Sequence, residues 1–175
     1  TYFKEDAVPY EVLTYEHVKM GRGNATIRLR VKNLLSGATL FKSYVSGKRV
    51  EDVQLDKQRV TYRYRNATDF VFEQDASEDP VEFPHSALGD KGKFLKKGMQ
   101  VDVLFYEERP IAIELPIKVA YVVKEAPPDA RGNTVSGSYK EVLLENNLRV
   151  KVPMFVKDHD AVIIDTRTGV YVSRG

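Results

Sequence analysis

Between His17 and Val50 the sequence carries a run of cationic side chains that could bind an anionic partner. This stretch has eight lysines and arginines and no carboxylate: Lys19, Arg22, Arg28, Arg30, Lys32, Lys42, Lys48 and Arg49. A solvated surface normally mixes both signs, because interspersed charges avoid self-repulsion. One sign over this length favours an anionic partner, with nucleic acid preferred to a membrane surface and chance clustering as the alternative.

Arg22 stands between Gly21 and Gly23. The segment is expected to be the tip of a hairpin, where glycines supply positive φ angles. No carboxylate is close in sequence, so the guanidinium is expected to project into solvent or into a partner. If it projects only into solvent, Arg22 is an ordinary turn arginine that keeps the protein soluble. A phosphate-binding loop is excluded, because no Lys-Ser/Thr pair follows the glycines and Thr26 occupies the third glycine position of Gly-x-Gly-x-x-Gly.

The cations are expected to lie on or between β-strands, because apolar and polar side chains alternate along most of the chain. In residues 26–32, Ile27, Leu29 and Val31 face one way and the cations face the other. Residues 60–65 and 70–72 are expected to form a hairpin with its turn at 66–69, and residues 100–106 and 111–115 another. Further strands are expected at 117–124, 148–152, 161–165 and 170–172. Residues 86–97 could hold one short helix.

The resulting fold class is all-β. Strands recur about every ten residues with turn residues between them, a spacing that is typical of small barrels or sandwiches. The 175 residues are expected to form three units, 1–52, 53–115 and 116–175. Lysines and arginines outnumber acids nine to six in the first unit and nine to seven in the third, whereas twelve acids face nine cations in the second. Zero cysteines fit a reducing cytosol.

Other chemistry finds little support in the residues. Asp158-His159-Asp160 is expected to be an exposed turn and not a metal site, because no second His/Asp cluster accompanies it. No nucleophile elbow or catalytic triad spacing occurs, so an enzyme is not expected. Tyr62, Tyr64, Phe70 and Phe72 could stack bases. Because they alternate along strands, core packing is the preferred interpretation.

Several motifs in order resemble the bacterial elongation factor P family. They are Pro9-Tyr-Glu-Val12, Glu16-His-Val-Lys19, Gly21-Arg-Gly23, Lys32-Asn-Leu-Leu-Ser-Gly37, Tyr62 to Tyr64, Glu114-Leu-Pro116, Pro153-Met-Phe155 and Asp165 to Arg174. The resemblance covers nearly the whole chain. It implies an SH3-like (KOW-type) first domain and two OB-fold domains in an L-shaped, tRNA-like arrangement, which agrees with the three units.

The resemblance also implies a function. Such a protein binds the ribosome between the P and E sites, where its partners are ribosomal RNA and the P-site peptidyl-tRNA. It relieves stalling at consecutive prolines without acting as an acid or a base, by holding the tRNA in a reactive geometry. It is expected to be cytoplasmic and monomeric, with no membrane partner and no cofactor.

Specific residues take roles through this resemblance. Arg22 becomes the residue that points toward the peptidyl-transferase centre, in a tip loop with Met20, Gly21, Gly23 and Asn24. Phosphate contacts are expected from Lys19, Arg28, Arg30, Lys32, Lys42, Lys48 and Arg49. A codon-side loop is expected at Gly132, Asn133, Thr134, Ser136 and Gly137, and further RNA contacts at Tyr171 and Arg174.

The sequence departs from the family pattern in two places. Many relatives carry a modified lysine at the tip and a proline two positions earlier, where this chain has Arg22 and Met20. One subset carries arginine and rhamnosylates it, which leaves open whether Arg22 is bare or is the substrate of an arginine rhamnosyltransferase. Asn133 replaces the usual aspartate of the codon-side loop. A general OB-fold protein that binds single-stranded RNA stays as the alternative function.

Overall fold

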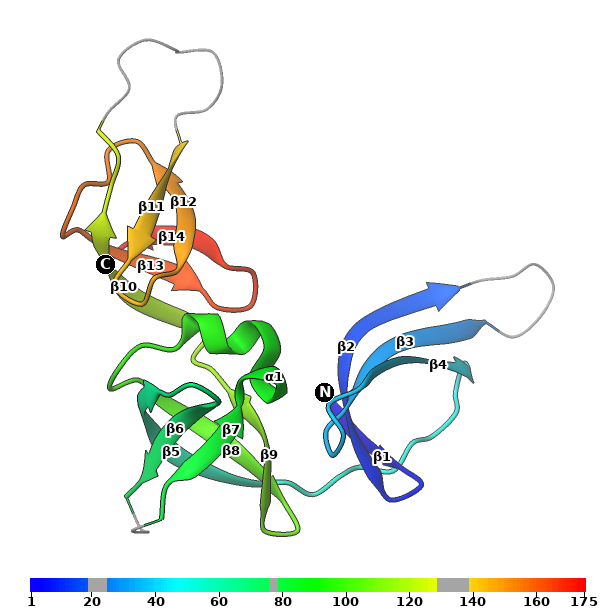
Figure 1. Ribbon diagram of the computed structural model, residues 1–175. Coiled ribbons are helices and arrows are strands. Elements are labelled where there is room, and N and C mark those ends of the chain that lie inside the picture. Colours follow the sequence, from blue (N-terminus) through cyan, green and yellow to red (C-terminus); the bar gives the residue numbers. More distant parts are fainter. Residues whose placement is uncertain (19–24, 76–78, 129–138) are drawn as a thin grey trace. The chain divides into compact units, whose positions relative to one another are not determined.

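The regular structure of the described residues is almost entirely antiparallel β-sheet, as expected from the alternation (Figure 1). The computed structural model describes residues 1–18, 25–75, 79–128 and 139–175. These residues form three sheets, which matches the expected SH3-like and OB-type barrels. They divide into two compact units, one of residues 1–57 with 104–112, the other of residues 58–103 with 113–175.

The first sheet has four strands in the order β1-β2-β3-β4. They are β1 (Tyr2–Glu5), β2 (Val8–Val18), β3 (Thr26–Asn33) and β4 (Thr39–Val45). Its core is built from Phe3, Tyr10, Leu29, Val31 and Tyr44, which are all buried. The Phe3 ring stacks on Tyr10 with centroids 5.4 Å apart and meets Tyr44 edge-on at 6.4 Å. Aromatic packing therefore holds this small sheet together.

The second sheet has the order β7-β6-β5-β8-β9. Its strands are β5 (Asp56–Arg65), β6 (Asp69–Gln74), β7 (Val81–Pro84), β8 (Gln100–Tyr106) and β9 (Arg109–Glu114). A short helix α1 (His85–Leu88) and a 3-10 helix η1 (Gly89–Phe94) follow β7 and overlap residues 86–97, where the sequence predicts a short helix. Both predicted hairpins are present, with turns at 66–68 and 107–108.

The third sheet has the order β12-β11-β10-β13-β14. Its strands are β10 (Lys118–Glu125), β11 (Tyr139–Leu144), β12 (Arg149–Pro153), β13 (Ala161–Asp165) and β14 (Val170–Arg174). The core is apolar and fully buried, with Tyr121, Val123, Leu144 and Ile164 at its centre. The second unit joins this sheet to β5–β7 and η1, since the Tyr121 hydroxyl donates to the Phe94 carbonyl at 2.5 Å.

One aromatic residue departs from the sequence prediction. Tyr62, Phe70 and Phe72 are buried as expected, but the side chain of Tyr64 is 57% exposed. The pairing of β5 with β6 shifts register between Tyr62 and Tyr64. Such a bulge breaks the period-2 alternation, so two residues that should share a face no longer do. The core prediction was therefore wrong for Tyr64.

No helix among the described residues is long and apolar enough to cross a membrane.

Candidate nucleic-acid interface

The predicted tip loop connects two strands that the structure describes up to its edges. Val18 of β2 and Thr26 of β3 are antiparallel partners. The strands predicted to flank the loop are therefore present and correctly paired. The tip residues themselves lie outside the described residues: Lys19, Met20, Gly21, Arg22, Gly23 and Asn24. The role of Arg22 thus stays a prediction.

The cations of β3 lie on its outer face. Arg28 and Arg30 are exposed and Lys32 is half-buried, whereas Leu29 and Val31 are buried. Alternation across the strand is the cause, because successive side chains point to opposite faces of a sheet. Among the described residues Arg30 makes no ion pair, so its guanidinium is available to an anion. The phosphate contacts of Arg28, Arg30 and Lys32 stay predictions.

The outer face of this sheet carries both signs and an aromatic ring. In the register, Glu16 of β2 lies opposite Arg28, and Glu11 lies opposite Lys32. On the other side of β3 the Arg28 guanidinium lies over the ring of Phe41, 4.5 Å from its centroid. The run of one sign along the sequence is thus not a patch of one sign on the sheet, because β2 contributes carboxylates that precede His17 in the chain.

Lys42 and Lys48 differ from the cations of β3, because both bind Glu5. Lys42 is the register partner of the buried Leu29 and so lies on the core side of the sheet. Its ammonium group donates to Glu5 Oε2, and Lys48 Nζ donates to Oε1 at 3.1 Å. The Tyr44 hydroxyl donates to Oε2 at 3.0 Å. Lys42 therefore does not lie on the outer face with Arg28 and Arg30.

In the cluster of Glu5, Lys42, Lys48 and Tyr44, the pKa values of Glu5 and Tyr44 both depart from their ordinary values. Hydrogen bonding from Lys42, assisted by Lys48 and Tyr44, lowers the pKa of Glu5 to about 2. Burial, and then the hydrogen bond to Glu5, raises the pKa of Tyr44 far above its ordinary value. Glu5 is thus a carboxylate and Tyr44 a phenol at every ordinary pH. The predicted phosphate contacts of Lys42, Lys48 and the exposed Arg49 stay predictions, and the first two already hold an internal anion.

Near the C-terminus, the two predicted RNA contacts lie on β14. Arg174 approaches Asp160 at 3.5 Å and lies over the ring of Phe155, 5.8 Å from its centroid. Tyr171 lines a surface hollow of about 840 Å³ together with Tyr139, Lys140 and Lys151. The codon-side loop lies outside the described residues: Gly132, Asn133, Thr134, Ser136 and Gly137.

The segment Asp158-His159-Asp160 forms an exposed turn, as expected. His159 has a φ of 67°. Asp158 Oδ1 accepts the Ala126 amide at 2.5 Å, and Asp160 Oδ2 accepts the Lys157 amide at 2.9 Å. Both carboxylates thus satisfy backbone groups. Across the described part of the chain, no group of three or more His, Asp or Glu side chains could hold a metal ion.

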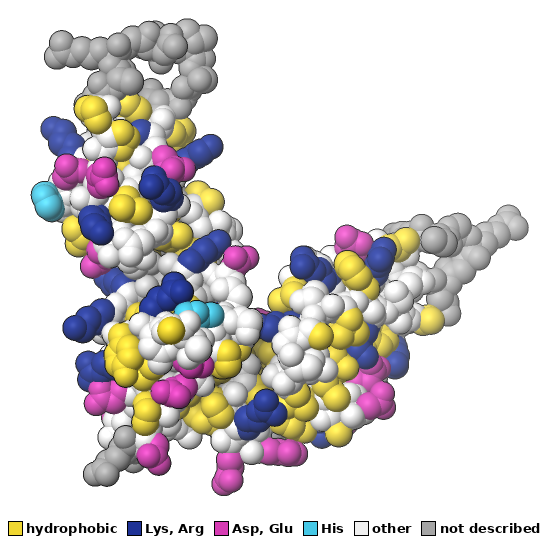
Figure 2. All heavy atoms as spheres, in the orientation of Figure 1, with side chains coloured by type: hydrophobic (Ala, Val, Ile, Leu, Met, Phe, Trp, Pro, Cys, Tyr) yellow, Lys and Arg dark blue, Asp and Glu magenta, His cyan; other side chains and the backbone are white. Residues whose placement is uncertain are grey.

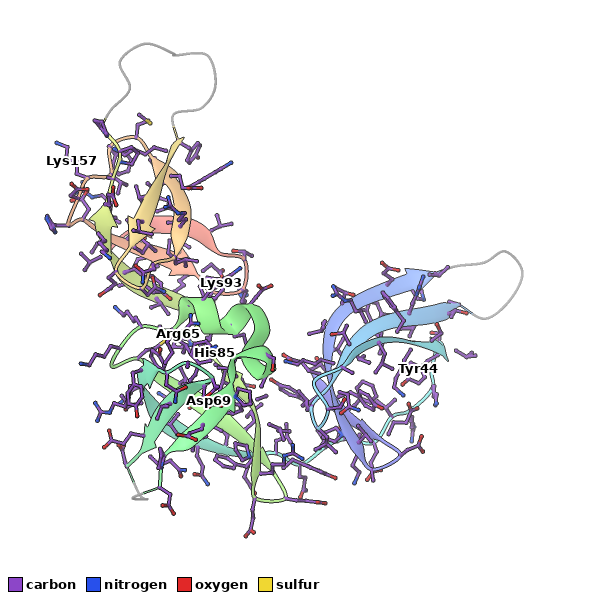
Figure 3. The ribbon with its side chains drawn as sticks, in the orientation of Figure 1. Tyr44, Arg65, Asp69, His85, Lys93 and Lys157 are labelled. Carbon is purple, nitrogen blue, oxygen red and sulfur yellow. The ribbon has the colours of Figure 1, made fainter. Side chains whose placement is uncertain are left out.

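A cationic hollow in the second unit was missed by the sequence reasoning. It measures about 850 Å³ and is lined by residues 62–65, Phe70, 92–93, 95–97 and 145–149. Figure 3 labels two of its cations, Arg65 and Lys93. They come from separate segments that only the fold brings together. The signal in the sequence is the alternation Tyr62-Arg63-Tyr64-Arg65, which favours core rings with solvated cations between them.

Comparison with known proteins covers nearly the whole chain. Three family models match in order: the KOW-like domain of elongation factor P at residues 1–50, its OB domain at 55–113 and its C-terminal domain at 119–174. Elongation factor P of Dictyoglomus turgidum is 41% identical over 94% of this chain and 89% of that protein. Those of Mycobacterium ulcerans and Aquifex aeolicus are 37% and 39% identical over 97% and 95% of this chain, and 90% and 86% of their own lengths.

The match is continuous in the order of the domains and leaves no described sheet outside it. The fold agrees with it independently, because each of the three matched regions forms one antiparallel sheet. The chain therefore belongs to the elongation factor P family.

Proposed function

We propose that this chain is a translation elongation factor that binds the ribosome between the P and E sites and promotes peptide-bond formation at consecutive prolines. One observation carries the proposal: all three domains of the family match in order over nearly the full chain. Its partners are then the ribosome, its RNA and the P-site peptidyl-tRNA. The protein acts as a monomer and supplies position, not acid-base chemistry.

Arg22 is the residue on which the proposed mechanism depends. A guanidinium is planar, permanently charged and able to donate several hydrogen bonds, so it can hold ribose or phosphate oxygens without titrating. Proline reacts slowly because its ring nitrogen is a sterically constrained nucleophile. Ordering the tRNA end lowers the entropic part of the barrier. The strands that flank the loop are antiparallel and paired at Val18 and Thr26, which supports the proposal because they form a scaffold for the tip.

The exposed cations of β3 support a second part of the proposal. Arg28 and Arg30 lie on one face of the strand that leads away from the tip loop. In the proposal they contact phosphates of the tRNA acceptor arm, which positions the factor without reading sequence. The mixed charge of the outer face limits the number of phosphate contacts, since Glu11 lies opposite Lys32 and Glu16 lies opposite Arg28.

Modification of Arg22 is a separate proposal. Rhamnosylation by an arginine rhamnosyltransferase would extend the tip and keep its charge. A single deoxyhexose on the peptide that contains Arg22, found by mass spectrometry of protein from its native host, is the expected result. An unmodified peptide would mean that the bare guanidinium is the mature form.

Replacing Arg22 tests the main proposal. The Arg22→Ala variant is expected to bind ribosomes and to lose rescue of a triple-proline reporter in a reconstituted translation system. Lys157→Ala, which removes an exposed cation from the second unit, is the matched control and is expected to rescue fully. Rescue by Arg22→Ala at the level of the wild type would refute the role of the tip.

The alternative, a general single-stranded RNA-binding protein, would use an open aromatic face. Burial of Tyr62, Phe70 and Phe72 removes three of the four rings that this alternative needs. It predicts that the Arg22→Ala exchange has no effect, so the same experiment separates the two functions.

A further inference from the structure

The cationic hollow of the second unit carries an excess of positive charge, which favours an anionic ligand. Six lysines and arginines line it: Arg63, Arg65, Lys93, Lys96, Lys97 and Arg149. Its one carboxylate is Glu145. Glu145 Oε1 already accepts the Val122 amide at 3.0 Å and Lys96 Nζ at 3.2 Å. Glu145 therefore already has partners within the protein, and the remaining cations make the electrostatic potential of the hollow positive.

Two of these cations are free to bind a ligand. Arg63 pairs with Glu73, Lys93 with Asp90 and Arg149 with Glu141. Arg65 and Lys97 are exposed and make no ion pair with any residue that the structure describes. The Arg65 guanidinium lies over the ring of Phe70, 5.6 Å from its centroid, which holds it at the wall of the hollow. Figure 2 shows that Lys and Arg side chains are frequent on this unit.

An exposed aromatic ring accompanies the charge. Tyr64 lines the hollow, and its side chain is 57% exposed because of the bulge in β5. The other three rings that the sequence offered as a stacking platform, Tyr62, Phe70 and Phe72, are buried. A free ring beside free cations is the combination that binds single-stranded nucleic acid, with a base on the ring and phosphates on the cations. An acidic peptide or a membrane surface can also contact a tyrosine, but only a nucleic acid offers a stacking base beside each phosphate.

The cationic hollow adjoins a second hollow through a shared residue. Arg149 lines both this hollow and the neighbouring one of about 840 Å³, which also contains Lys140, Lys151 and the exposed Tyr139. Cations and tyrosines therefore continue from the end of β5 across β12 to the start of β14. A polymer with a charge on every unit fits such a track better than an isolated phosphate.

We propose that the cationic hollow is a binding site for single-stranded RNA, in which Tyr64 stacks on an unpaired base while Arg65 and Lys97 contact the flanking phosphates. The site shares no residue with the tip loop and goes beyond the proposed role of Arg22. It gives the second unit an RNA contact of its own. The strand continues past Arg149 into the neighbouring hollow.

The test measures binding of the full chain to a fluorescein-labelled oligouridylate of about 12 nucleotides, within the range of OB-fold site sizes, by anisotropy over a salt series. Tyr64→Ala is expected to weaken binding by about fivefold to 150-fold, and Tyr64→Phe, which keeps the ring, is expected to bind like the wild type. Arg65→Gln/Lys97→Gln is expected to reduce the salt slope by about 1.4, or about 0.7 for each lost phosphate contact. Lys118→Gln/Lys157→Gln removes two exposed cations outside both hollows and is expected to leave the slope almost unchanged.

Three results would overturn the proposal. The first is equal binding by Tyr64→Ala and the wild type, with thermal unfolding of the two proteins unchanged. The second is an equal loss of slope in the two double variants. The third is tighter binding of duplex RNA than of the single strand. Amide chemical shifts provide an independent check, since the oligomer should perturb residues 62–65, 93–97 and 145–149.

A failure of this proposal can be distinguished from a failure of the proposed function. Binding is measured without ribosomes, and the effect of Tyr64→Ala is expected to persist in the Arg22→Ala background. Loss of rescue by the tip variant with no effect of Tyr64 would keep the function and reject the site. The reverse pattern would keep the site and reject the tip.

Discussion

The hydroxyl of Tyr121 donates a hydrogen bond to the main-chain carbonyl of Phe94 at 2.5 Å, and so ties the third sheet to the end of η1. Tyr121 has no exposed surface, and Phe94 is 5% exposed. Burial raises the pKa of Tyr121 well above its ordinary value, so the donor keeps its proton over the whole working range of pH. This contact lies within the second unit, where the cationic hollow also lies.

Removing that hydroxyl should destabilise the second unit. Tyr121→Phe leaves the buried Phe94 carbonyl without this donor, at an expected cost of about 1–3 kcal/mol in the free energy of unfolding. Urea denaturation followed by circular dichroism measures it. Tyr139→Phe is the matched control, because the Tyr139 side chain is 65% exposed, and it should change stability little. Equal effects of the two exchanges would contradict the assigned role of the bond.

Gly92 has no room for a side chain. A Cβ atom at this position would lie 2.5 Å from Cζ and 2.7 Å from Cε2 of the Phe70 ring. Gly92→Ala should therefore force the ring or η1 to move, at a cost of about 1–3 kcal/mol. In Phe70→Leu/Gly92→Ala the smaller side chain leaves space, so the effect of Gly92→Ala should be smaller in that background. Additive effects in this double-mutant cycle would show that the two residues do not clash.

Glu5 should make the stability of the chain depend on pH in the acid range. Its pKa is about 2 in the folded protein against an ordinary value of 4.5, so its contribution is complete above pH 4.5 and is lost as the pH falls through about 2. Asp165 has a similarly lowered pKa of about 2, caused by Arg167, and titrates in the same window. The readout is therefore the difference between proteins: Glu5→Gln should be less stable at neutral pH, and the gap to the wild type should close toward pH 2. A constant gap would contradict the linkage.

Arg30 should act as a phosphate contact in ribosome binding. Arg30→Gln is expected to lower the salt slope of binding by about 0.7–0.9, the value of one neutralised phosphate. Lys42→Gln, although it removes the same charge from the neighbouring strand, should act mainly on folding stability, because Lys42 binds Glu5. Sedimentation binding at several salt concentrations, beside urea denaturation, separates the two effects. A slope that does not change in Arg30→Gln would place this residue off the RNA.

Local pattern was sufficient to predict most strands. The alternation in β3 and the turn residues between β5 and β6 and between β8 and β9 were enough, since side-chain period and turn chemistry act over a few residues. Strands with weaker alternation, such as β4 and β7, were not predicted. The family could also be predicted, because its motifs are contiguous in sequence.

Features that depend on neighbours along the chain could thus be predicted without the fold: the alternation of the strands, the absence of cysteine chemistry and the order of the family motifs. The fold, in contrast, sets which charged side chains are neutralised by ion pairs. Glu5 reaches Lys42 across the first sheet, and the pairing of β2 with β3 sets Glu16 opposite Arg28. The register shift in β5 brings Tyr64 to the surface. The physical reason is that pairing register and bulges act between strands far apart in sequence, and charge neutralisation depends on distance in space.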